Sequence, residues 1–361
     1  MCVHECVHNI ERCMANVSSS VAASLPRVES MRRRVQRIRH TTRPFLATPK
    51  CREDLILPDE FKETWKGDQF LLHDSGGKNR FLIFSCEKNL NYLAKCSTIL
   101  YDGTFFCVPS IFAQLYSIHG LSQCGKTLPL VYILMPNRRY STYINVLNAL
   151  LEYKPEIKLD KIIIDFESAF IKAVHDIFPN AIVSGCNFHL NQCLYRNVQN
   201  DGLAVLYNTD INFSTGIRML AALAFVPCND VDFAFDMLSK SIFFVDNLAV
   251  LNTFLSYFKN TWLGVVNARG KRKALFELKL WNCYERVVNN DSRTNNSVEG
   301  WHSSFNKLFS SAHSSKGEFI NCLKDEQSQT EIFLAQIDVQ RDISPYKKRR
   351  HAEVDKRLKV I

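Results

Sequence analysis

Three acidic residues are the candidates for chemistry in this chain, because each lies in a setting that could hold a metal ion. Asp102 lies within Ile-Leu-Tyr-Asp-Gly-Thr-Phe, Asp165 follows a run of three isoleucines, and Glu299 precedes Gly-Trp-His. Carboxylate oxygens are the ligands that Mg²⁺ prefers. Paired cations held by such groups can drive phosphodiester chemistry. The rest of the sequence decides whether the three residues can meet.

Each of these residues also has an ordinary structural explanation. Asp-Gly is a common turn pair, which would make Asp102 a turn residue. Asp165 precedes a helix and could cap it, and Glu299 could occupy the third helical position of a sequence close to a capping box. For each residue considered alone, the structural explanation is favoured over a role in chemistry. Taken together on adjacent elements, the carboxylates would repel one another, and a shared cation would remove that conflict.

The composition describes a globular chain with a moderate positive charge. The chain has 361 residues, 25 of them Phe, and a formal net charge of +9. This length allows two domains or one domain with a large insertion, and the charge suits a polyanionic partner. The 13 cysteines lack the spacing of a disulfide framework, which favours a reducing compartment. No stretch is long and apolar enough for a transmembrane helix, so we expect no membrane association.

From residue 81 onward, the apolar pattern predicts a mixed sheet with helices on its faces. After a short strand at 81–85, three apolar runs predict a meander of strands at 98–106, 111–119 and 128–134. The next elements alternate between helix and strand: helix 143–151, strand 161–164, helix 170–177, strand 181–184 and helix 188–198. This order matches the α/β RNase H-like fold. In that topology the strands ending near Asp102 and Asp165 are central neighbours, so both carboxylates are expected in one crevice.

The remaining segments surround this core. Residues 1–60 are predicted to be a basic leader, or the end of a truncated zinc-finger module that contains Cys2, His4, Cys6 and His8. Residues 80–200 form the first part of the core. Residues 201–285 lose the alternation and predict a helical insertion, with helices at 217–225, 231–244 and 248–258. Residues 286–330 complete the core on a helix that carries Glu299, and residues 340–361 form a basic tail.

Basic residues cluster in a few runs. A run at 31–40 fits a solvated helical face, a phosphate-contacting arm or a nuclear localisation signal, and the sequence leaves these open. The tail offers a second candidate for localisation. The candidate DNA contacts are Arg32, Arg33, Arg34, Arg37, Arg39, Lys271, Arg272, Lys273 and His302.

Cys186 and His189 form a Cys-x-x-His motif directly after the fifth strand of the predicted core. The spacing suits half of a zinc site. No second pair with ligand spacing follows nearby, so a structural zinc is not supported. A buried cysteine beside a histidine at a helix N-terminus is an equally good explanation. His189 could alternatively contact a substrate phosphate or a carboxylate.

Four signatures together resemble the transposase domain of Mutator-like elements, the MULE transposases. They are Asp102-Gly-Thr-Phe, Asp165-Phe-Glu167, Cys186-Asn-Phe-His189 and Asn295-Asn-Ser-Val-Glu-Gly-Trp-His302. The resemblance covers about residues 80–310 and implies an RNase H-like core with a DDE triad and a helical insertion before the Glu. It assigns Asp102, Asp165 and Glu299 to the metal-binding triad, and Cys186 and His189 to the accessory motif. The upstream zinc finger that full elements commonly carry has only a short Cys/His leader as its counterpart here.

The resemblance implies a DNA transposase that uses Mg²⁺ or Mn²⁺ to cut and join element ends. It further implies double-stranded DNA and a homo-oligomer as partners, and the nucleus as location. Two alternatives stay open. One is a transposase-derived protein that binds DNA or chromatin without cutting it, and the other is a nuclease of the same fold acting on an RNA–DNA hybrid.

Overall fold

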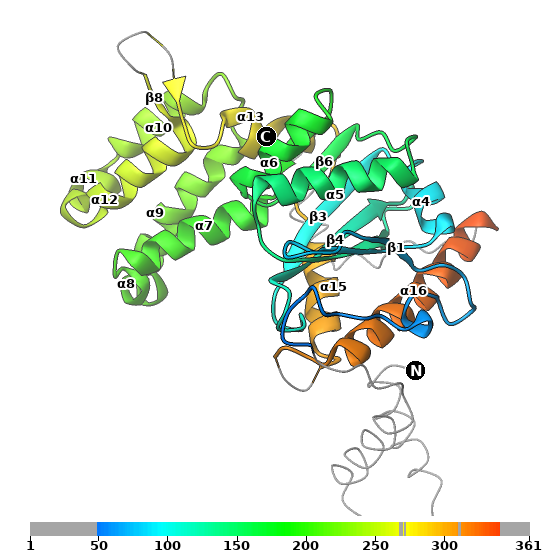
Figure 1. The fold of residues 1–361 in the computed structure, drawn as a ribbon. Coiled ribbons are helices and arrows are strands. Elements are labelled where there is room, and N and C mark those ends of the chain that lie inside the picture. The colour runs from blue at the N-terminus through cyan, green and yellow to red at the C-terminus, as the bar shows by residue number, and fades with distance from the viewer. Residues whose placement is uncertain (1–48, 267–269, 271, 310–311, 340–361) are drawn as a thin grey trace, which may run out of the picture. The chain divides into compact units, whose positions relative to one another are not determined.

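The computed structural model describes residues 49–266, 270, 272–309 and 312–339. Within these ranges the chain forms two compact units (Figure 1). The first unit contains residues 49–95, 103–157 and 300–339, and the second contains residues 96–102 and 158–299. Residues 1–48 of the predicted leader, the predicted tail at 340–361 and all five candidate arginines between positions 32 and 39 lie outside the described residues.

In the described part of the chain, seven strands form one mixed sheet in the order β1-β2-β5-β4-β3-β6-β7. The pairs β1–β2, β2–β5 and β4–β5 are antiparallel, whereas β3–β6 and β6–β7 are parallel. With helices on its flanks, this sheet has the predicted RNase H-like fold. The strands are β1 (Leu71–Asp74), β2 (Leu82–Phe84), β3 (Thr98–Thr104), β4 (Gln114–Leu121), β5 (Thr127–Met135), β6 (Lys161–Ile164) and β7 (Ile182–Gly185).

The first unit is built on the antiparallel strands. Nearly every residue of β4 and β5 is buried, as expected for a sheet covered on both faces. Among the helices of this unit, α4 (Glu87–Leu93) and α16 (Lys316–Asp338) both pack on β5. The helix α5 (Tyr140–Tyr153) follows β5 and corresponds to the helix predicted at 143–151.

Two elements of the first unit differ from the sequence prediction. β1 and the buried side chains of Phe61 and Phe70 belong to its core, although the core was expected to begin near residue 80. The 23-residue helix α16 was not predicted. Its buried side includes polar residues such as Gln327, whose Oε1 accepts a hydrogen bond from Asn89 Nδ2 at 2.7 Å. A helix that buries paired polar groups lacks the apolar stripe by which helices are recognised.

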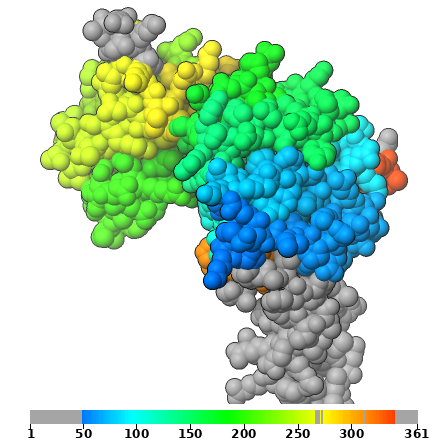
Figure 2. Space-filling model, in the orientation of Figure 1, coloured from blue at the N-terminus to red at the C-terminus, as the bar shows by residue number. Residues whose placement is uncertain are grey.

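The second unit joins the parallel strands to the helical insertion. The helices α6 (Ser168–Ile177) and α7 (Asn187–Asn200) follow β6 and β7. Of the three helices predicted for the insertion, the one at 248–258 is observed with the same bounds as α12 (Leu248–Phe258). The one predicted at 231–244 is divided into α10 (Val231–Ser239) and α11 (Ile242–Asp246), and the one predicted at 217–225 begins earlier, as α9 (Ile211–Ala222). The short helix α8 (Ala204–Thr209) precedes them. In Figure 1, α7 lies beside α12, and contacts between their residues agree with this view. Figure 2 shows the surface of this segment in green to yellow.

Short elements complete the second unit and lead the chain back toward the last helix of the core. They are the turns η2 (Leu223–Phe225) and η3 (Lys259–Leu263), the strand pair β8 (Val265–Val266) and β9 (Arg272–Lys273), and the helices α13 (Leu278–Trp281), α14 (Tyr284–Val288) and α15 (Asn296–Asn306).

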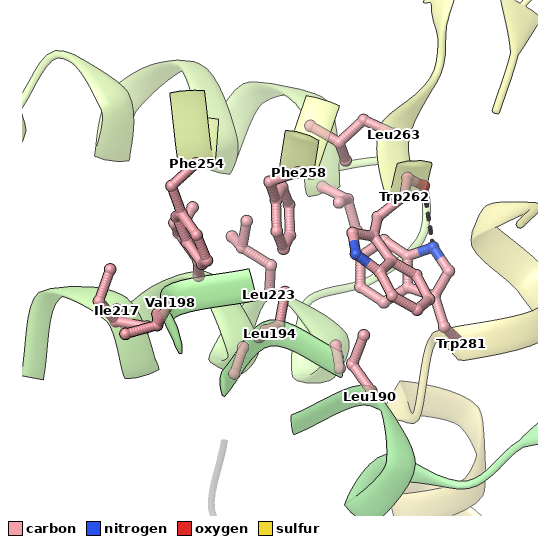
Figure 3. Close-up of a cluster of buried hydrophobic side chains, with 14 of the residues drawn as sticks. Leu190, Leu194, Val198, Ile217, Leu223, Phe254, Phe258, Trp262, Leu263 and Trp281 are labelled. Atoms are coloured by element: carbon pink, nitrogen blue, oxygen red, sulfur yellow. Dashed lines mark hydrogen bonds between the residues drawn. The ribbon is translucent and has the colours of Figure 1, made fainter. Parts of the chain in front are cut away.

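One hydrophobic core connects α7, the insertion and α13 (Figure 3). Leu194 of α7, Phe258 of α12 and Trp281 of α13 are all buried in it. Trp281 packs edge-on against Phe258, with ring centroids 6.2 Å apart, and its Nε1–H donates to the carbonyl of Trp262 at 2.9 Å. Burying the indole therefore leaves its polar atom satisfied. The insertion shares its core with the helix that follows β7 and is not a separate appendage.

Within the described ranges, none of the helices combines the length and apolarity that a membrane crossing requires.

Candidate metal centre

The two aspartates occupy equivalent positions on adjacent parallel strands. Leu100 of β3 pairs with Ile163 of β6. Continuing this register by two residues on each strand brings Asp102 opposite Asp165, at the carboxyl end of β6 where ligands of α/β sheets bind. Asp102 is buried inside β3 and is not a turn residue. Asp165 is not a helix cap either, since Glu167 holds the N-cap position of α6.

Glu299 reaches the same region from α15. This helix begins at Asn296, so Glu299 is its fourth residue and not the third residue of a capping box. The backbone N–H of Glu299 donates to the carbonyl of Asn295 at 3.1 Å. Its carboxylate does not fold back on the helix end: Oε1 lies 3.0 Å from His189 Nε2 of α7. The glutamate therefore faces α7.

Asp102, His189 and Glu299 form a compact cluster. One ligand atom from each residue lies within 4.8 Å of those of the other two. The sequence predicted a trio of Asp102, Asp165 and Glu299, and the cluster contains two of these carboxylates together with the imidazole of His189. Contact of His189 with a phosphate or a carboxylate was one of the alternatives that the sequence left open, and the structure places its Nε2 beside the carboxylate of Glu299.

The electrostatics of the cluster favour a cation. Burial, together with the negative charge of Asp102, raises the pKa of Glu299 from 4.5 to about 7. Ionising both carboxylates is therefore unfavourable in the protein alone, and a nearby positive charge would offset that repulsion. Two carboxylates fit a hard divalent ion such as Mg²⁺ or Mn²⁺. The donor set thus fits the metal that the sequence implied.

Asp165 lies outside this three-residue cluster. The negative charge of Asp165 acts on a residue of α7. Burial is the main cause that raises the pKa of the Cys193 thiol; Arg196 lowers this pKa, and Asp165 raises it. The register places Asp165 next to Asp102 on the sheet. Asp165 is therefore a neighbour of the cluster.

The two residues of the Cys-x-x-His motif have different partners. Cys186 is fully buried, and its Sγ–H donates to Oδ1 of Asn295 at 2.8 Å. The backbone N–H of Asn295 donates in turn to Cys186 Sγ at 3.3 Å. Burial is the main reason that the pKa of Cys186 is raised to about 11, which keeps the thiol protonated. Cys186 therefore acts as a hydrogen-bonding group, whereas His189 joins the carboxylates.

A comparison with known protein families identifies part of this site. The model of the MULE transposase domain matches residues 98–193. This chain contains a MULE transposase domain. The matched part of the MULE domain runs from β3 to α7 and includes Asp102, Asp165, Cys186 and His189. Glu299 lies beyond the match, and the fold brings it to the cluster. No curated protein matches the chain.

The residues predicted as DNA contacts lie in different surroundings in the structure. Lys271 lies outside the described residues, as do the arginines of the leader. Arg272 and Lys273 form β9, where Lys273 is exposed. His302 is buried, and its Nε2 lies 2.9 Å from Oγ of Ser117. A buried ring that faces a serine of the first unit does not fit the predicted role of His302 as a DNA contact.

Sequence reasoning did not identify Asn295 as part of the site. Asn295 is fully buried, and it connects Cys186 to the start of α15. The asparagine belongs to a motif that was recognised. Its partner lies 109 residues away in the chain, however, so nothing in the local sequence indicated the contact.

Proposed function

We propose that this protein is a metal-dependent DNA transposase that hydrolyses a phosphodiester at element ends and joins the freed 3′ end to target DNA. The observation that carries the proposal is the meeting of Asp102, His189 and Glu299 within 4.8 Å in a chain with a MULE transposase domain. The proposed partners are double-stranded DNA and further copies of the same chain, and the proposed location is the nucleus.

In this proposal the acidic residues hold divalent cations, Mg²⁺ or Mn²⁺. Asp102 and Glu299 supply oxygen ligands from β3 and α15, and Asp165 supplies a third carboxylate from the neighbouring strand. When bound, such cations activate the attacking oxygen and stabilise the leaving oxygen of an in-line displacement.

The protein's own groups fix the geometry of this centre. The parallel pairing of β3 with β6 sets the spacing of the two aspartate backbones. His189 Nε2, at 3.0 Å from Glu299 Oε1, holds the glutamate carboxylate in one orientation. Pre-set ligands of this kind need little rearrangement when charge develops in the reaction.

The experiment is a nicking and strand-transfer assay with the full chain. The substrates are supercoiled plasmid and DNA from terminal repeats that flank the coding region. Wild-type protein is expected to nick and join DNA with Mg²⁺ or Mn²⁺ and to lose activity in EDTA. Asp102→Ala and Glu299→Gln should both be inactive. Asp246→Asn is the matched control, because it removes an exposed carboxylate of the second unit outside the cluster.

Three outcomes would refute the proposal. Equal activity of the Asp102→Ala protein would remove the assigned role of the cluster. Salt-sensitive DNA binding without nicking under any divalent cation would instead favour a transposase-derived binding protein, since phosphate contacts alone release counterions. Preference for an RNA–DNA hybrid over duplex DNA would point to a different nuclease of the same fold.

A further inference from the structure

Two sequence motifs of the second unit dock against each other residue by residue. Cys186 is the N-cap of α7, and His189 lies three positions later on the first turn of the same helix. Asn295 directly precedes α15, and Glu299 lies four positions after it. Cys186 contacts Asn295, and His189 contacts Glu299. Residues three and four apart share one helix face, so one turn of α7 faces one turn of α15.

The Cys186–Asn295 contact is reciprocal and buried. Cys186 donates to the Asn295 side chain at 2.8 Å and accepts from the Asn295 backbone N–H at 3.3 Å. Both residues are fully buried, so water does not replace either bond. The Asn295 carbonyl then accepts the backbone N–H of Glu299 at 3.1 Å. Asn295 thus bonds to the thiol of Cys186 through its side chain and N–H, and to the backbone of Glu299 through its carbonyl.

The segment before Asn295 is held by further contacts to β6 and α7. Lys161 Nζ lies 2.6 Å from Oδ2 of Asp291. The backbone N–H of Asn187 donates to the carbonyl of Arg293 at 3.0 Å. Asn187 directly follows Cys186, so the same helix start binds residues 293 and 295. The path into α15 is therefore fixed by α7 at two consecutive residues.

We propose that Cys186 is a positioning residue that fastens Asn295 and thereby holds Glu299 beside Asp102 and His189. The proposal rests on the proposed function only where it assigns catalysis to Glu299. It explains why the motif needs a cysteine and a histidine separated by one helical turn: the first fixes the backbone of the glutamate's helix and the second its carboxylate. The motif is then a clasp between two helices, and its cysteine takes no part in a metal site.

Substitutions of Cys186 separate its hydrogen bonds from its bulk. Cys186→Ser keeps a hydroxyl that can both donate and accept. Cys186→Ala removes both bonds and leaves the buried Asn295 amide oxygen without its donor. Val198→Ala is the matched control, because Val198 is fully buried on the same helix but belongs to the hydrophobic core. It lowers stability without touching the clasp.

The first experiment is hydrogen exchange measured by mass spectrometry on the full chain without DNA. We expect exchange of the peptide covering 291–299 to rise by at least about threefold to tenfold in Cys186→Ala, since that range corresponds to one lost hydrogen bond and the substitution removes two. Exchange in Cys186→Ser should stay within about twofold of wild type, since its hydroxyl retains both bonds. In Val198→Ala it should rise in α7 and the insertion but not selectively in 291–299. Equal exchange of 291–299 in Cys186→Ala and Val198→Ala would overturn the proposal.

The second experiment measures nicking with Mn²⁺ as the divalent ion. Cys186→Ala should lower kcat while leaving the DNA concentration for half-maximal rate unchanged, and Cys186→Ser should restore kcat. Selective loosening of 291–299 without any loss of kcat would overturn the catalytic half of the proposal. If wild-type protein does not nick DNA at all, the proposed function fails, and the exchange experiment still decides whether Cys186 holds Glu299.

Discussion

Replacing Glu299 by Gln tests the electrostatics of the candidate metal centre without DNA. The substitution keeps the shape of the side chain and removes its charge. In wild type, Glu299 is partly buried and lies near the charge of Asp102, which together raise its pKa from 4.5 to about 7. The folded protein therefore holds a proton on this group more tightly than the unfolded chain does. Stability without metal must depend on pH in this window.

The sign and size of this pH-dependent change in stability follow from the linkage between proton binding and folding. Below pH 4.5 the carboxyl is protonated in both states and has no effect. As pH rises from 4.5 to about 7, the unfolded chain ionises first and the folded protein loses stability, and above pH 7 the loss is constant. The full difference corresponds to about 3 kcal/mol. Because the side chain is 25% exposed, solvent screening reduces the expected loss to about 1–2 kcal/mol.

The assay is urea unfolding with EDTA, followed by tryptophan fluorescence at several pH values from 5 to 8.5. Trp262 and Trp281 are buried in the second unit and report on its unfolding. At pH 8 the Glu299→Gln protein should be about 1–2 kcal/mol more stable than wild type, and the difference should shrink toward pH 5. Glu277→Gln, which removes an exposed carboxylate of the same unit, is the control and should show no such trend.

A divalent cation should reverse this order. Mg²⁺ or Mn²⁺ binds the folded wild type through its ionised carboxylates and should raise its stability at pH 8, whereas Glu299→Gln should gain much less. A Glu299→Gln protein that is no more stable than wild type at pH 8 in EDTA would refute the electrostatic reasoning. Equal stabilisation of both proteins by the cation would refute the assignment of Glu299 as a ligand.

Three further predictions concern the cluster and the second unit. Asp102→Asn removes one of the causes of the raised Glu299 pKa, so the pH at which half of the stability change has occurred should fall below that of wild type in the same urea assay. Its nicking rate should also drop by about a hundredfold or more. Gly216→Ala would place a Cβ against the ring of Phe243, and this overpacking should lower unfolding free energy by about 1–3 kcal/mol in urea. Phe258→Ala opens a cavity beside Trp281 and should lower unfolding free energy by about 3–5 kcal/mol, with a parallel fall in Tm by calorimetry.

Much of the core could be predicted because its strands carry continuous apolar runs. The isoleucines of β6 and the apolar residues of β3 identify buried central strands, and the parallel pairing of these strands follows from the order of the elements. Once the pairing is known, Asp102 and Asp165 must be neighbours. The sequence offered Glu299 as a residue that could complete the site, and the resemblance to a family assigned it to the triad, since no periodicity connects residues of α15 to β3.

The contacts that could not be predicted from the sequence are polar and join residues far apart in the chain. The burial of Asn295 depends on Cys186, and the burial of Gln327 in α16 depends on Asn89. Each of these polar groups is favourable inside the protein only because its partner is present. A single sequence shows each residue without its partner, so both look like surface residues. The same reason explains why α16 was missed and why the motif cysteine was considered as half of a zinc site.

The insertion determines where Glu299 can lie, although it contributes no acidic residue to the cluster. Leu194 of α7 packs in the same core as Phe258 of the insertion and Trp281 of α13. The chain continues from Trp281 into α14, where Arg286 Nη2 donates to the carbonyl of Gly185 at 3.0 Å, at the end of β7. The return of the chain to the sheet is thus fixed both by the insertion core and by a buried arginine. The contacts between α7 and α15 therefore form between elements that the insertion core also holds in place. The long segment before Glu299 is in this sense part of the scaffold of the metal centre.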